Sequence, residues 1–505
     1  MNRRKFLKYA GLAGGITLFP GVLYAADASS RFNDFKAIVT VDLQGGNDAL
    51  NTFIPTGSDS KTGYQKYYDE RGSSIAIQDT DLMDKLRNLS QNGKLEIASP
   101  SDNPYYENKD VQKSYMKGFY LLDNYFDSKI AINGLMPEIA YWMDKGRGVV
   151  VQNMGTIGGN YTKSELKADK SKLPPSLFAH NLQHYLAHIG EAKSFNVPTG
   201  WLGRLADIWG NVNNDPVYHM NINLSGYGEE RAMFGSKTTA MNYSFRGPIP
   251  LDKSLDKSFE EWLNSKPLND GMFKNLYSQL RKSSFIETVT TLKDWNDILE
   301  NNPFENVTDA YGNEIYKNQV VNKTQIGLET IINTRIIESF KTAARLIAIA
   351  KKKGFKRIAL SIVMGGYDQH SSLKKDHANR LRNLSLGIDV FMRAMEEINA
   401  LDEVVLISLS EFSRSTATNG DGSDHAWGGA QFVLGAVNPG NYGEFPDLTV
   451  GGGQDISSRG RLIPTTSYSQ YYGTVLKWFG ATEDEIDHAL PELSNFSTRD
   501  IGFMA

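Results

Sequence analysis

The chain has 505 residues, of which 40% are hydrophobic and 22% charged, a composition typical of globular proteins and not of disordered or fibrous ones. Lys and Arg number 54 and Asp and Glu 58, so the net charge is -4, and no nucleic-acid partner is expected. Because the chain has no cysteine, disulfides, thiolate nucleophiles, cysteine-bound zinc and iron–sulfur clusters are excluded. Any metal site must use carboxylates and the eight histidines.

Residues 1–28 have the layout of an export signal. Arg3 and Arg4 precede an apolar, glycine-rich run from Tyr9 to Ala26 that ends in small residues. The paired arginines resemble a twin-arginine signal, which predicts that the export machinery carries a folded protein to the periplasm or the medium. The alternative is an N-terminal membrane anchor. No other stretch reaches about 18 apolar residues, so no stable membrane span is expected after signal removal.

Four short apolar runs, rich in β-branched residues, each end in a polar or glycine-rich turn. Their lack of alternation predicts strands buried on both faces, as in a parallel sheet. The runs are Phe35–Leu43, Gly148–Gln152, Arg357–Met364 and Glu403–Leu409.

Helical patterns lie between and after these runs, at Thr324–Lys353, Leu381–Asn399 and Ser467–Phe479. This alternation predicts an α/β fold with a mainly parallel sheet flanked by helices. We expect one domain over residues 29–505, with irregular insertions near 58–130 and 225–320 that form a cap over the site.

Aromatic residues are dense in the first insertion. They predict either a binding surface or, in the simpler interpretation, a local core under the insertion. They are Tyr105, Tyr106, Tyr115, Phe119, Tyr120, Tyr125 and Phe126.

Polar residues with metal-binding side chains follow the predicted strands, and ligands in open α/β sheets bind at the carboxyl ends of the strands. Asp368 and His370 stand two apart after Gly365-Gly366, so in extended chain both face the same way. The alternative is a surface loop that happens to hold Asp and His.

The strand at 403–409 leads directly to Glu411, and His425 follows fourteen residues later in a loop of Gly, Ser and Asp. A metal that bridges Glu411 and His425 would anchor this loop. Arg414 is a candidate for binding a phosphate or sulfate group, or else a structural partner of Glu411 or Asp424. Asp424 is also a candidate for orienting His425.

The first strand is followed by Asn47 and Asp48 after a Gly-Gly turn. Asp48 is the preferred ligand here, and its alternative role is the N-cap of a short helix. Asn47 is a candidate for holding oxygens of the substrate. Asp42 lies inside the strand and is expected to be structural.

The predicted ligands combine hard carboxylate oxygens with imidazoles, a mixture that suits zinc, manganese or iron, and less well magnesium or calcium. Five ligands exceed the need of one closed site, so we expect one or two divalent ions. The ligands are Asp48, Asp368, His370, Glu411 and His425.

Ser176 follows Pro174-Pro175, where a helix is expected to begin, and a hydroxyl at that point near a metal is a candidate nucleophile. The alternative is an ordinary N-cap. His180, His184 and His188 recur at intervals of four residues on one helix face. Among them His180 is expected to face the site, and the other two to be solvent or packing residues.

Together these motifs resemble one family. LQGGNDALNTFIP, PTGWLGRLAD, MGGYDQH, SEFSRSTATNGDGSDHAWGG and GRLIPTTSYSQYYGTVLKWFG resemble, in this order, the exported bacterial domain-of-unknown-function family 1501, which is grouped with the alkaline-phosphatase and sulfatase superfamily. The resemblance implies an alkaline-phosphatase-like core and a metal-dependent hydrolase site with the ligands named above. Relatives tend to carry Ser-His-Phe, whereas this chain has Ser176-Leu177-Phe178.

The resulting hypothesis is an exported hydrolase of a small or polymeric phosphate or sulfate ester, with Ser176, His180 and Arg414 in catalysis. The alternative is a non-catalytic cell-envelope protein that binds an anionic polymer on the same fold. An oxidoreductase with an organic cofactor is disfavoured, because no GxGxxG motif follows the first strand.

Overall fold

The structure is a computed structural model that describes residues 30–89, 117–194, 196–225, 230–248, 271–310, 312, 314–317 and 334–505. The predicted export signal, residues 1–28, lies outside these ranges. None of the described helices combines the length and apolar character needed to cross a membrane.

A central nine-stranded sheet organises the described chain, with the strand order β13-β5-β12-β9-β1-β8-β6-β7 and β14 paired to β5. Strand β12 is antiparallel to β5 and β9, while the other pairings in this sheet are parallel. The strands are β1 (Lys36–Gln44), β5 (Gly148–Gly155), β6 (Asn221–Asn223), β7 (Met241–Asn242), β8 (Arg357–Gly365), β9 (Val404–Leu409), β12 (Gly429–Gly435), β13 (Gly440–Tyr442) and β14 (Thr466–Ser467).

The predicted fold class is confirmed. All four predicted strands are present as β1, β5, β8 and β9, and all four belong to this mostly parallel sheet. Strand β1 pairs in parallel with β8 on one side and β9 on the other. The carboxyl ends of these three strands therefore lie next to one another.

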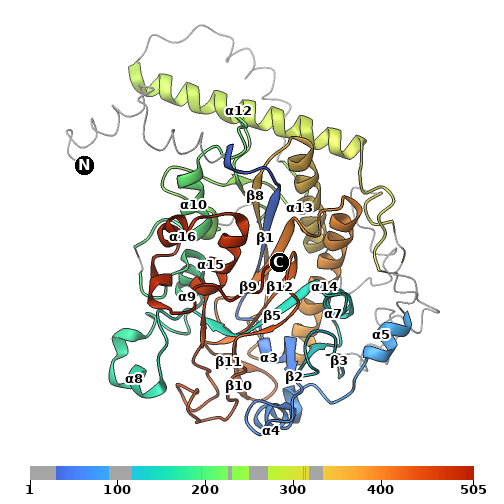
Figure 1. Cartoon of the computed structure of the whole chain (residues 1–505), viewed down its shortest axis with the longest axis vertical. Coiled ribbons are helices and arrows are strands. Elements are labelled where there is room, and N and C mark those ends of the chain that lie inside the picture. The colour runs from blue at the N-terminus through green and yellow to red at the C-terminus, as the bar shows by residue number, and fades with distance from the viewer. Residues whose placement is uncertain are drawn as a thin grey trace.

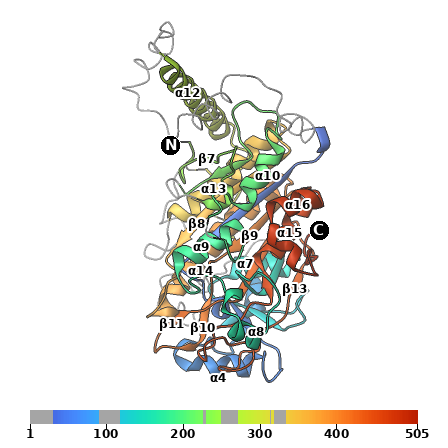
Figure 2. The same cartoon turned by 90° about the vertical axis from the view of Figure 1, so that its left-hand side faces the viewer.

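Helices cover both faces of the sheet, as the alternation of side chains along β1 requires (Figure 1). Ala37, Val39 and Val41 belong to the core shared with one helix layer, whereas Ile38 belongs to the core on the other face. The first layer holds α7 (Pro137–Asp144), α13 (Thr334–Lys352) and α14 (Leu373–Glu397), and the second holds α9 (His180–Ile189), α10 (Trp201–Trp209), α15 (Tyr468–Phe479) and α16 (Glu483–Ala489). Figure 2 looks onto the second layer.

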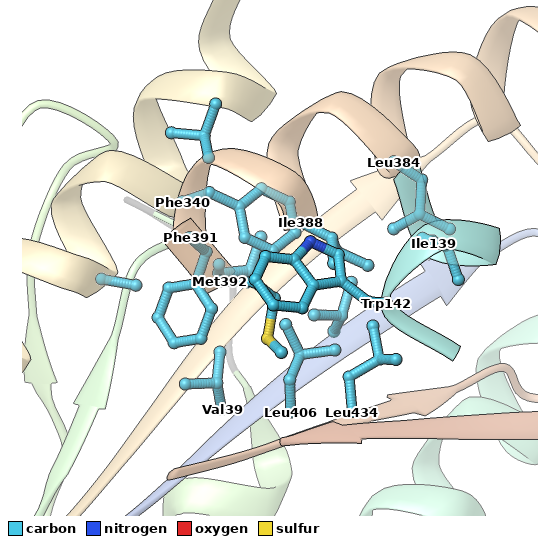
Figure 3. Packing of buried hydrophobic residues seen from close by; sticks show 14 of the residues in the cluster. Val39, Ile139, Trp142, Phe340, Leu384, Ile388, Phe391, Met392, Leu406 and Leu434 are labelled. Atoms are coloured by element: carbon cyan, nitrogen blue, oxygen red, sulfur yellow. The ribbon is translucent and has the colours of Figure 1, made fainter. Parts of the chain in front are cut away.

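Trp142 of α7 lies in the middle of the first core layer, between the helices and the strands (Figure 3). Phe391 and Met392 of α14 and Leu406 of β9 surround it and are fully buried. The indole N–H of Trp142 donates to the Asp389 carboxylate at 3.0 Å, so the polar atom of this large side chain has a partner inside the core.

The helices follow the predicted pattern with shifted boundaries. Helix α15 begins after Ser467, which forms a capping box with Gln470, and ends at Gly480, which is left-handed with φ 103°. Helix α14 begins at Leu373, eight residues before the predicted start at Leu381. Of the predicted helix Thr324–Lys353, residues 334–352 form α13 and 324–333 lie outside the described residues.

The described part of the first insertion forms α4 (Tyr64–Ile75), α5 (Met83–Leu89) and β3 (Phe119–Leu122), and it leads into β4 (Ile130–Asn133). Strands β2 (Phe53–Pro55), β4 and β3 form a separate antiparallel sheet. Of the aromatic residues noted above, Phe119, Tyr120 and Phe126 are buried and Tyr125 is 57% exposed, which fits a local core. Tyr105, Tyr106 and Tyr115 lie outside the described residues.

The second insertion contains α12 (Gly271–Glu300), at the end of the molecule opposite β10 (Arg414–Thr418) and β11 (Ser423–His425) (Figure 1). The remaining described elements are short: α3 (Ala49–Thr52), α8 (Lys163–Ala168), and 3-10 turns at Lys170–Lys172, Arg231–Met233 and Pro491–Asn495.

Candidate metal centre

Side chains from four segments meet at the carboxyl ends of β8 and β9. Strand β8 delivers Asp368 and His370, β9 delivers Glu411, and α9 contributes His180 at its first residue. The antiparallel pairing of β10 and β11 places Arg414 opposite His425, which returns His425 to the sheet edge. The five residues His180, Asp368, His370, Glu411 and His425 are called the open cluster below.

Three imidazole nitrogens of the open cluster converge on the Asp368 carboxylate. The Nε2 atoms of His370 and His425 lie 3.0 and 3.1 Å from its Oδ1 atom. The Nε2 atom of His180 lies 3.4 Å from its Oδ2 atom. The Nε2 atoms of His370 and His425 are 2.9 Å apart. His180, Asp368 and His425 form one of two groups in the described chain whose ligand atoms all lie within 4.8 Å of one another.

Neighbouring groups fix how the rings of the open cluster are turned. The Nδ1 atom of His180 lies 2.8 Å from Oε1 of Glu411. The Nδ1 atom of His425 lies 2.8 Å from the carbonyl oxygen of Phe178. With Nδ1 engaged, each ring presents Nε2 to Asp368, as metal-bound histidines usually do.

The electrostatics keep Asp368 ionised and His425 neutral at neutral pH. Burial raises the pKa of Asp368, but the hydrogen bond and positive charge of Arg414 outweigh it and hold the pKa at about 2. Burial lowers the pKa of His425. The hydrogen bond to Glu411 raises the pKa of His180.

The open cluster lies at the surface. The side chains of Asp368 and His370 are 45% and 47% exposed, whereas Glu411 is 3% exposed. The Phe412 ring packs beneath His180 and His425, with ring centroids 4.8 and 4.7 Å away. Solutes can therefore reach Asp368 and His370 directly. Two hollows of about 360 and 560 Å³ lie elsewhere, one beside His219 and Lys237 and the other between Tyr161 and Gln470.

A strained turn carries the carbonyl that holds His425. Residues 175–178 form a turn in which Ser176 and Phe178 have positive φ values of 45° and 93°. Such conformations are costly for residues other than glycine and tend to gather at functional sites. The strain here lies at the residue whose carbonyl contacts His425.

Ser176 is not at a helix N-terminus, contrary to the prediction. Helix α9 begins at His180 with Ala179 as its N-cap residue, and Ser176 is exposed in the preceding turn. Neither the dipole argument nor the N-cap alternative therefore applies to Ser176. Ser176 lies two residues before Phe178, whose carbonyl oxygen contacts His425 of the open cluster.

Arg414 does not offer its guanidinium to a substrate, contrary to the prediction. The side chain is buried and donates to the Asp368 carboxylate and to the carbonyls of Gly45, Gly46, Tyr367 and Ser423. Its carboxylate partner is thus Asp368 and not Glu411 or Asp424. Glu411 is close to Arg414 in the sequence and so looked like its partner. The sequence does not show that Asp368, which follows another strand, takes that place.

The structure does not bring Asp48 into the open cluster. Its carboxylate is fully buried and forms an ion pair with the equally buried Arg71 of α4. Asp48 does precede the short helix α3, but its side chain makes no capping hydrogen bond. The prediction missed Arg71 because it lies 23 residues away, in the insertion.

Asn47 and Asp424 also differ from their predicted roles. The Asn47 side chain is buried and bonds to Thr52 and His377, so it does not face a substrate. Asp424 lies 3.5 Å from Nδ1 of His370 and pairs with Arg459. It is therefore placed to orient His370, whereas the Phe178 carbonyl orients His425.

Sequence reasoning missed a second group, formed by Asp42, His184 and His188. Asp42 was expected to be structural, and the two histidines to be solvent or packing residues. The four-residue spacing from His180 to His188 was the available signal for a shared helix face.

Residues 305–464 match the family described as Protein of unknown function (DUF1501). The match covers less than half of the chain, and it supports the resemblance to domain-of-unknown-function family 1501 itself. It includes Asp368, His370, Glu411 and His425, whereas His180 lies outside it. No curated protein matches the sequence.

Two solved structures are similar at low levels. The crystal structure of Ps i-CgsB in complex with k-i-k-neocarrahexaose has 9% identity and a TM-score of 0.29, over 90% of this chain and 74% of that one. A crystal structure of Ps i-CgsB has 10% identity and a TM-score of 0.29, over 72% and 71%. Similarity at this level says nothing about function.

Asp48→Asn is expected to destabilise the protein without changing its metal content. The substitution leaves Arg71 buried without its counter-charge, which costs about 3–5 kcal/mol of unfolding free energy. Denaturant unfolding and elemental analysis measure the two effects. The control Asp402→Asn changes an 81% exposed partner of Arg147, and a loss within about 1 kcal/mol is expected. Loss of metal in folded Asp48→Asn protein would contradict this structural role.

Proposed function

We propose that this protein is an exported, metal-dependent hydrolase of phosphate or sulfate esters. The observation that carries the proposal is the convergence of three imidazole nitrogens on one ionised carboxylate at a solvent-open edge of the sheet. Export is supported by Arg3 and Arg4 in the first residues. Cell fractionation tests the export part, since replacing both arginines with Lys should retain the protein in the cytoplasm.

The donor set of the open cluster fits a divalent transition metal. Ligands bound at about 2.0–2.2 Å in a tetrahedral arrangement lie roughly 3.3–3.5 Å apart, and somewhat less at smaller angles. The distances of 3.0–3.4 Å from Asp368 to His180, His370 and His425 are near this size, as is the 2.9 Å between His370 and His425. His180, Asp368 and His425 alone meet the 4.8 Å criterion as a group, so they are the core of the donor set and His370 lies beside them. Moreover, Nε2 of His180 is buried and makes no hydrogen bond. The site therefore suits zinc, manganese or iron better than magnesium or calcium.

When bound, such an ion supplies Lewis-acid polarisation of the ester oxygens and neutralises negative charge that develops during transfer. The chain's own residues prepare the site for it. Arg414 fixes the Asp368 carboxylate, and Glu411 and the Phe178 carbonyl fix the His180 and His425 rings. Because these partners are buried or belong to the backbone, the donors are held in place before a substrate arrives.

An anionic substrate is favoured by two arginines beside the open cluster that the sequence analysis did not single out. The Arg461 guanidinium lies over the Phe178 ring, 4.3 Å from its centroid, and its Nε atom is buried without a hydrogen-bond partner. Arg459 is 67% exposed and pairs with Asp424, next to His370. These two side chains replace Arg414 as the candidates for holding phosphate or sulfate oxygens.

Ser176 is the nucleophile in this proposal. Its exposure and its position in the turn that carries Phe178 support this role. His180, the first residue of the following helix, stays in the site as a ligand, so its assignment changes from catalysis to metal binding.

Metal content should depend on the open cluster. Protein purified without chelator is expected to lose about one ion per chain in Asp368→Asn and in His425→Gln, because each change removes a donor from the site. Elemental mass spectrometry gives the count, and hydrolysis of 4-nitrophenyl phosphate and sulfate should fall with it. Asp402→Asn is the matched control. Retention of metal and of turnover in both variants would sink the proposal, while metal without turnover on any ester would favour the non-catalytic binding protein.

Replacing Ser176 with Ala should lower turnover at least about 1000-fold while leaving metal content unchanged, because the hydroxyl would be the attacking group. Ester hydrolysis under saturating substrate measures the effect. The control is Ser494→Ala, at an exposed site in the C-terminal region. Unchanged turnover would assign the attack to water and remove Ser176 from the site.

Arg461→Met should raise KM roughly 10–100-fold with little change in kcat, because a charged hydrogen bond to the bound ester is worth about 1.5–3 kcal/mol. Steady-state kinetics separate the two constants. Arg499→Met, which removes an arginine paired with Asp487, should leave both unchanged. An unaltered KM in Arg461→Met would refute anion binding by this side chain.

A further inference from the structure

A second group of histidines and carboxylates lies inside the protein, behind the open cluster. It consists of Asp42 on β1, His184 and His188 on α9, and Glu230, and is called the buried cluster below. Asp42 and His188 have fully buried side chains, Glu230 is 2% exposed, and His184 is 23% exposed. Uncompensated buried charge is costly, so these groups require partners.

Two ring nitrogens of the buried cluster approach one carboxylate oxygen. Oδ2 of Asp42 lies 2.7 Å from Nε2 of His184 and 3.3 Å from Nε2 of His188. The two rings lie against each other, with centroids 4.0 Å apart. Asp42, His184 and His188 satisfy the same 4.8 Å criterion as His180, Asp368 and His425.

Several polar atoms of the buried cluster have no hydrogen-bond partner. Despite the short distances, neither ring nitrogen of His188 makes a well-directed hydrogen bond, and Oδ1 of Asp42 and Oε1 of Glu230 also have no partner. A nitrogen and an oxygen about 3.0–3.4 Å apart, with the N–H direction off the line between them, match two neighbouring ligands of one ion bonded at about 2.1 Å.

Glu230 lies where a carboxylate that orients a metal-bound histidine would lie. Its Oε1 atom lies 3.0 Å from Nδ1 of His188, on the side of the ring opposite Asp42. Metal-bound histidines commonly contact a carboxylate through the second ring nitrogen. Gln44 contacts both proposed ligands, since its amide donates to Oδ2 of Asp42 at 3.0 Å and lies 3.0 Å from Nε2 of His184.

The charges agree with a divalent ion. A divalent cation would be held by the anionic Asp42 oxygen and by unprotonated ring nitrogens of His184 and His188.

We propose that Asp42, His184 and His188 bind a divalent first-row transition metal, with Glu230 orienting His188. Two imidazoles and one carboxylate suit zinc or ferrous iron. This site would tie β1 to α9 and so fix the helix whose first residue, His180, belongs to the open cluster. The inference does not depend on hydrolase activity, because it concerns different ligands.

The test uses the full chain with the open cluster disabled by Asp368→Asn and His425→Gln. Metal-free protein is titrated with Co(II), whose visible spectrum reports coordination, and with Zn(II) as the competing ion. We expect about one bound ion per chain in this background. Adding His184→Gln should weaken binding at least about 100-fold, and adding Glu230→Gln about 10–100-fold, because the first removes a ligand and the second its outer partner. Adding His488→Gln, on the exposed face of α16, is the matched control and should change nothing.

Absence of a bound ion in the background protein would overturn the proposal, as would unchanged affinity after His184→Gln. If the His184→Gln chain does not fold, zinc-edge X-ray absorption on the background protein decides the question. Scattering from two imidazoles supports the site, and its absence overturns it. Loss of ester hydrolysis in the Asp368→Asn, His425→Gln protein reports on the open cluster alone. The proposed function and the buried metal site can therefore be refuted independently.

Discussion

The Arg414 side chain holds the edge of the sheet that carries the open cluster together. Its guanidinium is buried and donates to backbone carbonyls that follow β1, to a carbonyl and a carboxylate that follow β8, and to a carbonyl of β11. Only a planar group with several fixed N–H directions can satisfy three segments at once. Asp368, the proposed ligand, is one of these contacts, so its position depends on how the three segments are placed relative to one another.

The close approach of these loops also constrains the backbone. Gly45 has a φ of 116°, and a Cβ atom at this position would lie 2.5 Å from the backbone nitrogen of Asp368. Its own N–H donates to Glu411 at 2.8 Å, so the turn after β1 contacts both the β8 loop and the carboxylate after β9. A side chain there would push Asp368 away from the imidazoles.

Much of this arrangement was accessible from the sequence because it follows from local patterns. Apolar β-branched runs identified β1, β5, β8 and β9, and the rule that ligands gather at strand ends pointed to Asp368, His370, Glu411 and His425. The rule failed where a partner comes from a distant segment. Asp48 follows a strand like the others, yet Arg71 from an insertion neutralises it.

Arg414 and Ser176 are two further residues whose surroundings could not be predicted from the local sequence. An arginine near acidic residues looks available in the sequence, but the three loops that converge on Arg414 are known only once the sheet is assembled. Ser176 follows two prolines, which usually precede a helix, but the chain forms a strained turn there and α9 begins four residues later. Asp42 and His184 are 142 residues apart, and nothing local indicates that they meet.

Helix α9 connects the two clusters through a repeated arrangement. His180 has a carboxylate, Glu411, at Nδ1 and points Nε2 toward Asp368. His188, two turns later, has Glu230 at Nδ1 and points Nε2 toward Asp42. At His180 the hydrogen bond to Glu411 favours the Nδ1–H tautomer, which leaves the Nε2 lone pair free for a cation, whereas Glu230 lies beside Nδ1 of His188 without a well-directed hydrogen bond. The same helix face thus presents imidazoles at two depths, one in the exposed open cluster and one in the buried cluster. A chain that only needed to fill the space behind β1 would bury apolar residues there, because unpaired histidines and carboxylates destabilise a core.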